Sequence, residues 1–271
     1  MNQSHGGSQQ GEQAAGVRGK VAIVTGATVG LGRAVALRLA QQGAKVVVTG
    51  RNRSAGEEVV RQIEAAGGQA VFLPADIEKL QEAREMVAQA HARFGAVDIL
   101  VASAGAASAA QGIFTEIDPN AVAEQIAKTV RIKLNPVHAA VPYMVAQKRG
   151  AILFLTSEGG RFPTPGQTTV SFHSAGLIMA AKVMAKELSR SLIRVNTLSV
   201  TIVQDTPVYE RFVGGELTPL RQKVFERISA QAPFGLANAD NVADVAAFLV
   251  SDASSHVTGA TLSATGGATY S

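Results

Sequence analysis

The chain has 271 residues, of which 46% are hydrophobic and 17% are charged, and these proportions suit one α/β domain with a large core. It contains no cysteine, which excludes disulfides, thiolate catalysis and thiolate metal sites. The formal net charge is +4, from 25 basic and 21 acidic residues, and the basic residues are scattered along the chain, whereas a nucleic-acid surface needs them clustered. We therefore expect no nucleic-acid partner.

The N-terminal stretch differs in composition from the rest of the chain. Residues 1–16 are rich in Gly, Gln and Ser and lack an apolar run, so we expect a disordered tail and not a signal peptide, followed by a single domain over residues 17–271. The most apolar helical stretch, residues 175–185, is interrupted by Lys182, and no run approaches the roughly 18 apolar residues that span a bilayer. The sequence therefore predicts a soluble, cytoplasmic protein with no membrane partner.

A strand, a glycine turn and a helix start follow the tail. Residues 21–25 form a β-branched run that is typical of a strand buried on both faces. The chain then passes through Gly26, Gly30 and Gly32 into residues 31–40, where apolar side chains recur at helical spacing. Such glycines let the backbone approach a pyrophosphate, and free amides at a helix start favour the anion. The spacing is G-x-x-x-G-x-G and not the commoner G-x-G-x-x-G, so a tight strand-to-helix connection is the alternative.

Strand and helix patterns alternate through the rest of the chain. Short apolar runs predict six further strands, at residues 45–49, 69–73, 97–101, 151–155, 194–198 and 261–264. Longer segments predict helices between them, notably at residues 79–94, 119–149 and 168–191. This alternation indicates right-handed crossovers, and hence an α/β, Rossmann-like, doubly wound parallel sheet of about seven strands with helices on both faces.

Local signals predict where two of the helices begin. Ser54 followed by Glu57 matches a capping box for the helix after the second strand. Asp118 and Pro119 suit the N-cap and first turn of a later helix. Pro136 lies inside that later helix and is expected to kink or divide it.

Ligands of such sheets bind beyond the carboxyl ends of the strands. The loops that would form the site begin at Gly26, Gly50, Asp76, Ala102, Thr156 and Ser199. The segment at residues 199–238 has the least regular pattern and is predicted to cover a bound substrate as a lid.

A set of short motifs extends along residues 17–267. They are TGATVGLG at 25–32, DI at 76–77, FGAVDILVASAG at 94–105, TS at 156–157, IRVN at 193–196, FLVSD at 248–252, VTG at 257–259 and GG at 266–267. With these separations the chain resembles the short-chain dehydrogenase/reductase family. The resemblance implies a nicotinamide dinucleotide cofactor and the oxidation of alcohols or reduction of carbonyls.

The resemblance also implies which residues contact the cofactor. These are Gly26, Thr28, Gly30, Leu31, Gly32, Arg51, Asp76, Ile77, Ser103, Ala104 and Gly105. Where NAD-specific members carry an Asp that binds the ribose 2′-hydroxyl, this chain has Gly50, and Arg51 follows it. A guanidinium can hold a 2′-phosphate bidentately, so the sequence favours NADP(H) over NAD(H), unless Arg51 is simply a solvated loop residue. Asp76 with Ile77 looks like the family's adenine-contacting pair, and a helix N-cap is the other role open to Asp76.

The catalytic positions depart from the family pattern. In the family's Tyr-x-x-x-Lys pair, an ammonium lies near a phenol and lowers its pKa from about 10. Counting forward from Ser157 puts these two positions at Val170 and Ser174, which supply neither a phenol nor a charge. The catalytic Asn position falls on Thr129, and Ser103 replaces the Asn of the Asn-Ala-Gly motif. Of the four catalytic residues, only Ser157 remains.

Ser157, Ser174 and His173 are the candidate catalytic residues. His173 has an ordinary pKa near neutrality and adjoins the lysine position, although packing at a subunit contact is the alternative role. Glu158 and Arg161 follow Ser157 and are candidates for binding a polar group of the substrate. The five histidines have no close spacing, so we propose no metal site.

Three functions are compatible with these observations. The first is an NADP(H)-dependent oxidoreductase that transfers hydride to or from a small-molecule alcohol or carbonyl with a degenerate catalytic tetrad. The second is a catalytically silent NADP(H)-binding subunit or sensor, and the third is a lyase or cyclase that uses the same pocket. The sequence favours the first. The family resemblance implies a homodimer or homotetramer packed through the helices near Val137 and Met179.

Overall fold

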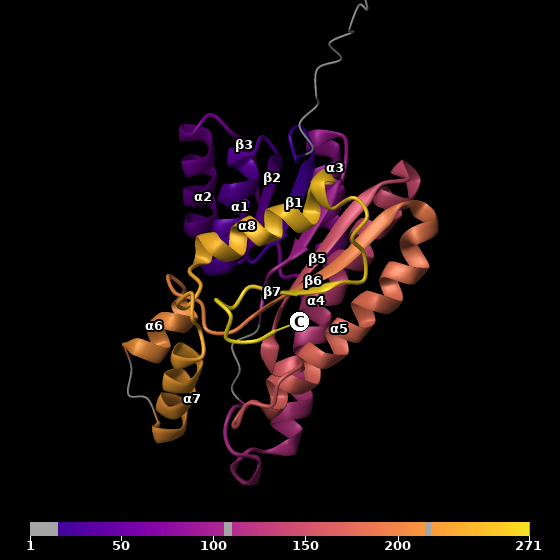
Figure 1. Cartoon of the computed structure of the whole chain (residues 1–271). Helices are drawn as coiled ribbons and strands as arrows, with labels where there is room; N and C mark the ends of the chain where they lie inside the picture. Colours follow the sequence, from indigo (N-terminus) through magenta and orange to yellow (C-terminus); the bar gives the residue numbers. More distant parts are fainter. Residues whose placement is uncertain (1–15, 106–109, 215–217, 271) are drawn as a thin grey trace, which may run out of the picture.

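The computed structural model describes residues 16–105, 110–214 and 218–270, and its centre is a single seven-stranded sheet (Figure 1). The strands are β1 (Val21–Thr25), β2 (Lys45–Gly50), β3 (Gln69–Pro74), β4 (Ile99–Ala102), β5 (Gly150–Ser157), β6 (Ile193–Val200) and β7 (Thr261–Ser263). Their order is β3-β2-β1-β4-β5-β6-β7, and every neighbouring pair is parallel. The predicted doubly wound sheet is therefore confirmed. The predicted N-terminal tail lies outside the described residues, except for Gly16.

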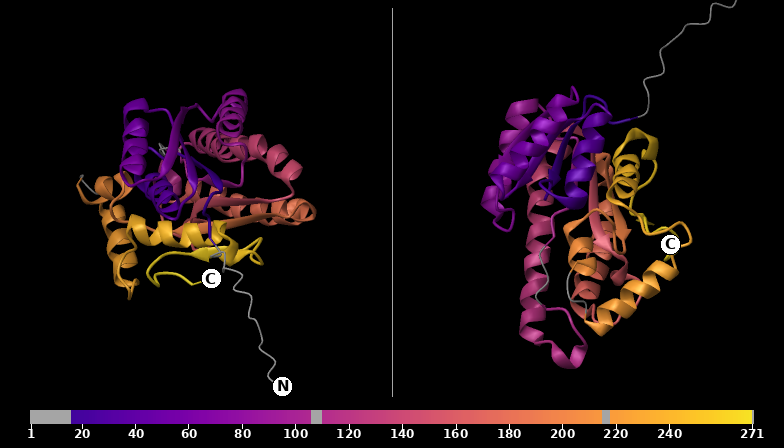
Figure 2. Two further views of the ribbon diagram at one scale, coloured as in Figure 1. Left: turned by 90° about the horizontal axis from the view of Figure 1, so that it is seen from above. Right: turned by 90° about the vertical axis from the view of Figure 1, so that its left-hand side faces the viewer.

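Helices cover both faces of the sheet (Figure 2). They are α1 (Gly30–Gln41), α2 (Arg53–Ala65), α3 (Leu80–Phe94), α4 (Pro119–Gln147), α5 (Thr168–Leu188), α6 (Pro207–Val213), α7 (Pro219–Ala230) and α8 (Ala239–Val250). Helices α1, α2 and α8 pack on one face, and α3, α4 and α5 on the other. Successive strand residues enter opposite cores, as Ile23 and Val24 do in β1, which is why the strands are apolar at consecutive positions. None of the helices that the structure describes combines the length and apolarity needed to cross a membrane.

The long helix α4 begins as predicted and is not divided at Pro136. Asp118 is its N-cap and accepts a hydrogen bond from the Asn120 amide at 2.9 Å, while Pro119 occupies the first turn. Pro136 does not divide the helix, which runs through it for 29 residues. Pro136 lies on the buried face, so packing against the sheet holds the helix together despite the lost backbone hydrogen bond.

The predicted capping box of α2 is wrong. The N-cap is Asn52, whose side-chain oxygen accepts a hydrogen bond from the Ala55 amide at 3.1 Å. Ser54 is already inside the helix, and its hydroxyl donates to the same Asn52 oxygen at 3.0 Å. Both residues are good caps, and the turn after β2 brings the chain into helical geometry two residues earlier than the Ser-Glu spacing suggested.

The two α2 residues form a matched pair for a stability test. We expect Asn52→Ala to lower the free energy of unfolding by about 1 kcal/mol, because it leaves a helix-start amide without its acceptor. Ser54→Ala should change it by less than about 0.5 kcal/mol, because the lost contact is on the surface. Urea unfolding followed by circular dichroism measures both values. Equal losses in the two variants would mean that Asn52 is not the cap.

Candidate functional site

The loops at the carboxyl ends of the strands surround a cavity of about 1060 Å³. Its walls come from the turn after β1, the ends of β2 and β3, the chain after β4, the end of β5, and the segment that contains α6 and α7 (Figure 1). All eleven residues predicted to contact the cofactor line it, as do Ser157 and His173. Part of the predicted lid also lines it, including Thr206 and Phe212, while residues 215–217 are outside the described structure.

The turn after β1 has room for backbone only. Gly26 has a φ of +64°, and a Cβ on it would lie 2.7 Å from the Cα of Ala104. A Cβ on Gly32 would lie 2.3 Å from the carbonyl oxygen of Gly26. The N-cap of α1, Val29, makes no side-chain cap hydrogen bond, so the first amides of α1 are available to an anion. These features fit the pyrophosphate of a dinucleotide.

A side chain at position 50, at the end of β2, would have to displace Thr28. A Cβ on Gly50 would lie 2.8 Å from Cγ2 of Thr28, and both residues line the cavity. The next residue, Arg51, is exposed and also lines the cavity. Asp76 is not a helix N-cap, since α3 is capped by Lys79; its carboxylate instead accepts from the Glu78 amide at 3.3 Å. The alternative N-cap role of Asp76 is therefore wrong.

Three buried polar atoms in the cavity wall lack a hydrogen-bond partner among the described residues. They are Oγ1 of Thr49, Oγ1 of Thr156 and Oε2 of Glu158. Glu158 is only 3% exposed, and its other oxygen accepts from the Ser263 hydroxyl at 2.7 Å. Buried polar atoms usually find a partner, which an ordered water or a polar ligand group can supply here.

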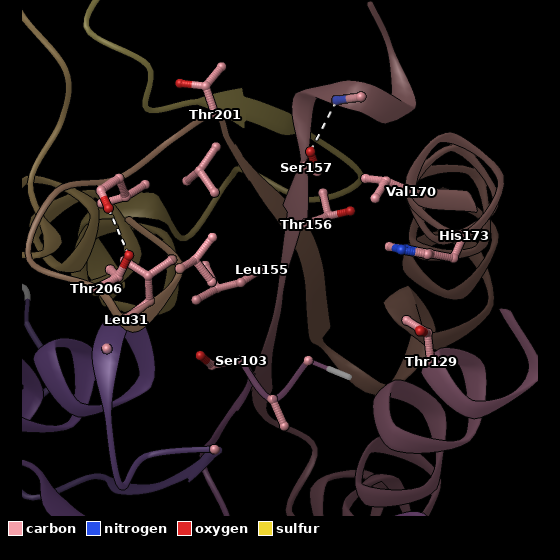
Figure 3. Close-up of a pocket in the computed structure, with 18 of the residues that line it drawn as sticks. Leu31, Ser103, Thr129, Leu155, Thr156, Ser157, Val170, His173, Thr201 and Thr206 are labelled. Carbon is pink, nitrogen blue, oxygen red and sulfur yellow. Dashed lines mark hydrogen bonds between the residues drawn. The ribbon is translucent and has the colours of Figure 1, made fainter. Parts of the chain in front are cut away.

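The candidate catalytic residues are only partly brought together. Ser157 and His173 point into the cavity from β5 and α5, with Val170 beside them and Thr129 extending from α4 (Figure 3). The Ser157 hydroxyl accepts from the Gly159 amide at 3.2 Å. Ser174 is fully buried and is not part of the cavity wall; its hydroxyl lies 3.3 Å from Nδ1 of His173. Ser174 can therefore orient the His173 ring but is not in a position to meet a substrate.

His173 is uncharged at neutral pH. Burial lowers its pKa to about 4, and the positive charge of Lys133 adds to the effect. The near-neutral pKa expected from the sequence is wrong, because that value belongs to a solvated ring. A neutral imidazole still donates at one nitrogen and accepts at the other. His173 can therefore hydrogen-bond a ligand or pass a proton on, but it is not an acid that carries an additional proton.

Lys133 is a cavity residue that the sequence reasoning missed. It extends from α4, is 6% exposed, and its ammonium donates to the carbonyl oxygens of Ala102 at 2.7 Å and Leu155 at 2.8 Å. Burial lowers its pKa to about 7. The sequence held one indication of this burial. Lys133 comes one helical turn after Thr129, at a spacing that places it on the buried face of α4.

Arg161 is engaged outside the cavity. Its guanidinium donates to the Ser263 hydroxyl at 3.1 Å and to the carbonyl oxygen of Tyr270 at 2.7 Å, and it lies 3.6 Å from Glu158. It therefore holds the C-terminal segment against the loop after β5 and is not one of the lining residues, whereas Glu158 is. No group of three His, Asp or Glu residues in the described part of the chain is arranged to hold a metal ion.

Comparison with known proteins agrees with this architecture. Residues 26–269 match a family model described as enoyl-(acyl carrier protein) reductase. The chain belongs to the short-chain dehydrogenase/reductase family. A 3-oxoacyl-[acyl-carrier-protein] reductase of Thermotoga maritima is 32% identical to this short-chain dehydrogenase/reductase, over 93% of this chain and 98% of that one. A 4-formylbenzenesulfonate dehydrogenase of Comamonas testosteroni is also 32% identical, over 92% and 97% of the two chains.

Solved structures show the same fold. A 7α-hydroxysteroid dehydrogenase, determined with NADH and 7-oxo glycochenodeoxycholic acid, superimposes with a TM-score of 0.84 at 29% identity, covering 93% of this chain and 95% of the other. A structure from Burkholderia xenovorans that is named as a short-chain dehydrogenase/reductase gives a TM-score of 0.85 at 29% identity, covering 94% of this chain and 98% of the other. This chain is therefore a member of an oxidoreductase family whose members use nicotinamide cofactors.

The buried lysine makes the stability of this short-chain dehydrogenase/reductase depend on pH. The pKa of Lys133 is about 7 in the folded protein and about 10.5 in the unfolded chain, so between these values the unfolded state binds more protons and the free energy of unfolding rises with pH. From pH 7 to pH 9, the wild type should gain roughly 1 kcal/mol per pH unit relative to Lys133→Met. Urea unfolding of both proteins at pH 7, 8 and 9, at one protein concentration, measures the gain. A wild-type-minus-variant difference that stays constant with pH would mean that the lysine titrates normally.

Proposed function

We propose that this short-chain dehydrogenase/reductase binds NADP(H) and transfers hydride between the nicotinamide and a small-molecule alcohol or carbonyl compound. The observation that carries the proposal is the backbone-only turn at Gly26 and Gly32, which opens onto the same cavity as Ser157. A pyrophosphate held at the start of α1 leaves the other end of the cofactor free to extend toward Ser157. When bound, the cofactor supplies the hydride, and the chain supplies binding, orientation and a proton.

Two features of the β2 end support NADP(H) over NAD(H). Thr28 fills the space in which a side chain at position 50 would start, so a carboxylate cannot stand there without moving Thr28. Arg51 lies at the rim of the same cavity and provides a planar pair of donors suited to a phosphate. The eleven residues that line this half of the cavity would hold the adenosine and pyrophosphate.

The names of the relatives favour carbonyl compounds as the substrate class. Those relatives are named for a 3-oxoacyl thioester, an aryl aldehyde and, as a bound molecule, a 7-oxo steroid. The apolar part of the cavity wall here includes Leu155, Val170 and Phe162, which suits a substrate with an apolar body. Ser157 would donate a hydrogen bond to the carbonyl oxygen and polarise it.

A catalytically silent NADP(H)-binding subunit is the second candidate. The observation that favours it is Val170, which lines the cavity at the position where the family has its tyrosine and cannot donate a proton. The alternative differs from the first candidate in one outcome only, which is tight cofactor binding without turnover of any carbonyl compound.

We also propose that the protein is cytoplasmic and forms a homodimer or homotetramer through α4 and α5. Large apolar side chains stand exposed on α5, namely Phe172, Met179 and Val183, and a face of this kind is commonly covered by another copy of the chain.

The cofactor preference can be tested with Arg51→Asp. We expect this variant to bind NADPH roughly 10- to 100-fold more weakly, because it removes a charge-assisted contact and places a carboxylate near the phosphate. NADH binding should be retained or improved. Titration of reduced-nicotinamide fluorescence measures both affinities. Arg53→Asp is the control, since Arg53 is exposed, pairs with Glu57 and lies outside the cavity wall. An unchanged NADPH-to-NADH preference in Arg51→Asp would show that Arg51 does not hold the phosphate.

The reaction can be tested with a panel of acetoacetyl-coenzyme A, 9,10-phenanthrenequinone and 4-carboxybenzaldehyde, following the loss of NADPH absorbance. We expect turnover of at least one compound, and a roughly 100-fold lower rate in Ser157→Ala at unchanged NADPH affinity, because the carbonyl loses its donor. Ser255→Ala, on the exposed surface, is the control. NADPH binding without any turnover would favour the catalytically silent subunit. Failure to bind either nucleotide would leave a lyase or cyclase as the remaining hypothesis.

A further inference from the structure

The proposed reduction needs a proton, and the usual donor position holds a valine. Hydride transfer to a carbonyl carbon leaves an alkoxide that must be neutralised. Among the described tyrosines, only Tyr270 lines the cavity, and it is 75% exposed at the edge of the C-terminal segment. His173 is neutral and has no proton in reserve. Lys133 is a buried cationic group in the cavity wall that the proposed function has not yet used, whereas Lys128, Arg211 and Arg227, which also line the cavity, are not buried.

The Lys133 amine is held at two of its three hydrogen-bonding positions. Its Nζ donates to the carbonyl oxygens of Ala102 and Leu155, near the carboxyl ends of the neighbouring strands β4 and β5. An ammonium has three N–H bonds, whereas a neutral amine has two and a lone pair. Both protonation states can therefore keep both carbonyl contacts. The two states differ only at the third position, where a proton or a lone pair stands, and the proton can leave or arrive without breaking the anchorage.

The surroundings of Lys133 contain no carboxylate that would hold its proton. Helix α4 packs against α3, α5, β4 and β5. From α5 the titratable group is His173, which is neutral. From the loop after β5 it is Glu158, whose Oε1 accepts from Ser263 and lies 3.6 Å from Arg161. Helix α3 directs His91 at Tyr143, more than two turns further along α4, and β4 contributes apolar residues. On α4 itself, Lys128 lies by Glu78 at 3.9 Å, at the outer rim.

We propose that Lys133 is the proton donor of this cavity, an inference that rests on the proposed carbonyl reduction. A bound reduced nicotinamide would supply hydride to the carbonyl carbon, and the π pair of the C=O bond would move onto the carbonyl oxygen. That oxygen takes the third proton of the Lys133 ammonium, directly or through one water. The carbonyl would thus be reduced to the alcohol at the expense of the cofactor. Lys133 would remain as a neutral amine, hydrogen-bonded to the backbone carbonyls of Ala102 and Leu155, until solvent protonates it again.

Burial makes Lys133 acidic enough to act as a proton donor near neutral pH. Desolvation alone lowers its pKa to about 7, so at neutral pH both forms are populated and the ammonium is a far stronger acid than a surface lysine. Lys133 is not at the position where the family carries its lysine, which here is Ser174. It reaches the cavity from α4, one turn beyond Thr129, which Figure 3 shows on the same side of the cavity as His173.

The first test is a pH–rate profile with whichever panel compound is reduced. In the wild type, kcat/KM for reduction should fall as pH rises above about 7, because the donor must be protonated. Lys133→Met should lose roughly 100- to 10,000-fold in rate and lose this pH dependence, while its NADPH affinity changes less than about threefold. Lys133→Arg keeps the charge but does not release a proton near neutrality, so it should be equally slow. Lys182→Met, on the exposed face of α5, is the matched control and should behave as the wild type.

The second test needs no turnover. The Nζ resonances of ¹⁵N-labelled lysine, followed by NMR from pH 5 to pH 10, should include one with a midpoint between about 6 and 8 that is absent from Lys133→Met and present in Lys182→Met. A midpoint above 9 overturns the inference, as does a Lys133→Met enzyme with the wild-type rate and pH profile. Wild-type protein that binds NADPH but reduces no panel compound also overturns it. Failure to bind NADPH, in contrast, overturns the proposed function, whatever the lysine titration shows.

Discussion

The contact between the turn after β1 and the chain after β4 sets the arrangement of the whole site. No side chain fits between Gly26, Gly32 and Ala104, so two neighbouring strands and the first turn of α1 meet at one point. The carboxyl ends of the other parallel strands follow from the sheet order and fall along the same edge. A cavity at that edge is therefore a consequence of backbone packing, and the side chains around it decide only what the cavity binds and does.

The sheet was predictable because its five central strands are buried on both faces. β1 matches its predicted residues, Val21–Thr25, and β2 and β3 each extend one residue beyond their predictions. Helix starts were less predictable, as α2 shows: Asn52 and Ser54 have nearly equal capping ability, and the local turn decides between them. Proline normally breaks an isolated helix, but α4 continues through Pro136 because this residue is buried against the rest of the fold. That burial can be seen only in the packed structure.

The site, like the fold, has a part that local sequence patterns predicted and a part that they did not. The cofactor half was predictable because glycine spacing and Arg51 are local signals, and all the residues inferred there line the cavity. The absence of a phenol and an ammonium at positions 170 and 174 was also readable by counting from Ser157. Lys133 was not found, because a lysine in an amphipathic helix is ordinarily assigned to the solvent face. Its burial and its two carbonyl partners depend on how α4 meets β4 and β5, which no local pattern records.

The hydrogen bond between Arg161 and the C-terminal segment affects where a purification tag should be attached. By binding the Tyr270 carbonyl, Arg161 makes the last described residues a wall of the cavity, with the Tyr270 side chain at its mouth. A polyhistidine tag fused directly after Tyr270 would begin at this mouth, where its imidazoles would compete with ligands or pull the segment away from Arg161. Purification tags are therefore better placed before residue 1, because the chain enters the fold at β1, whose amino end lies at the edge of the sheet opposite the cavity.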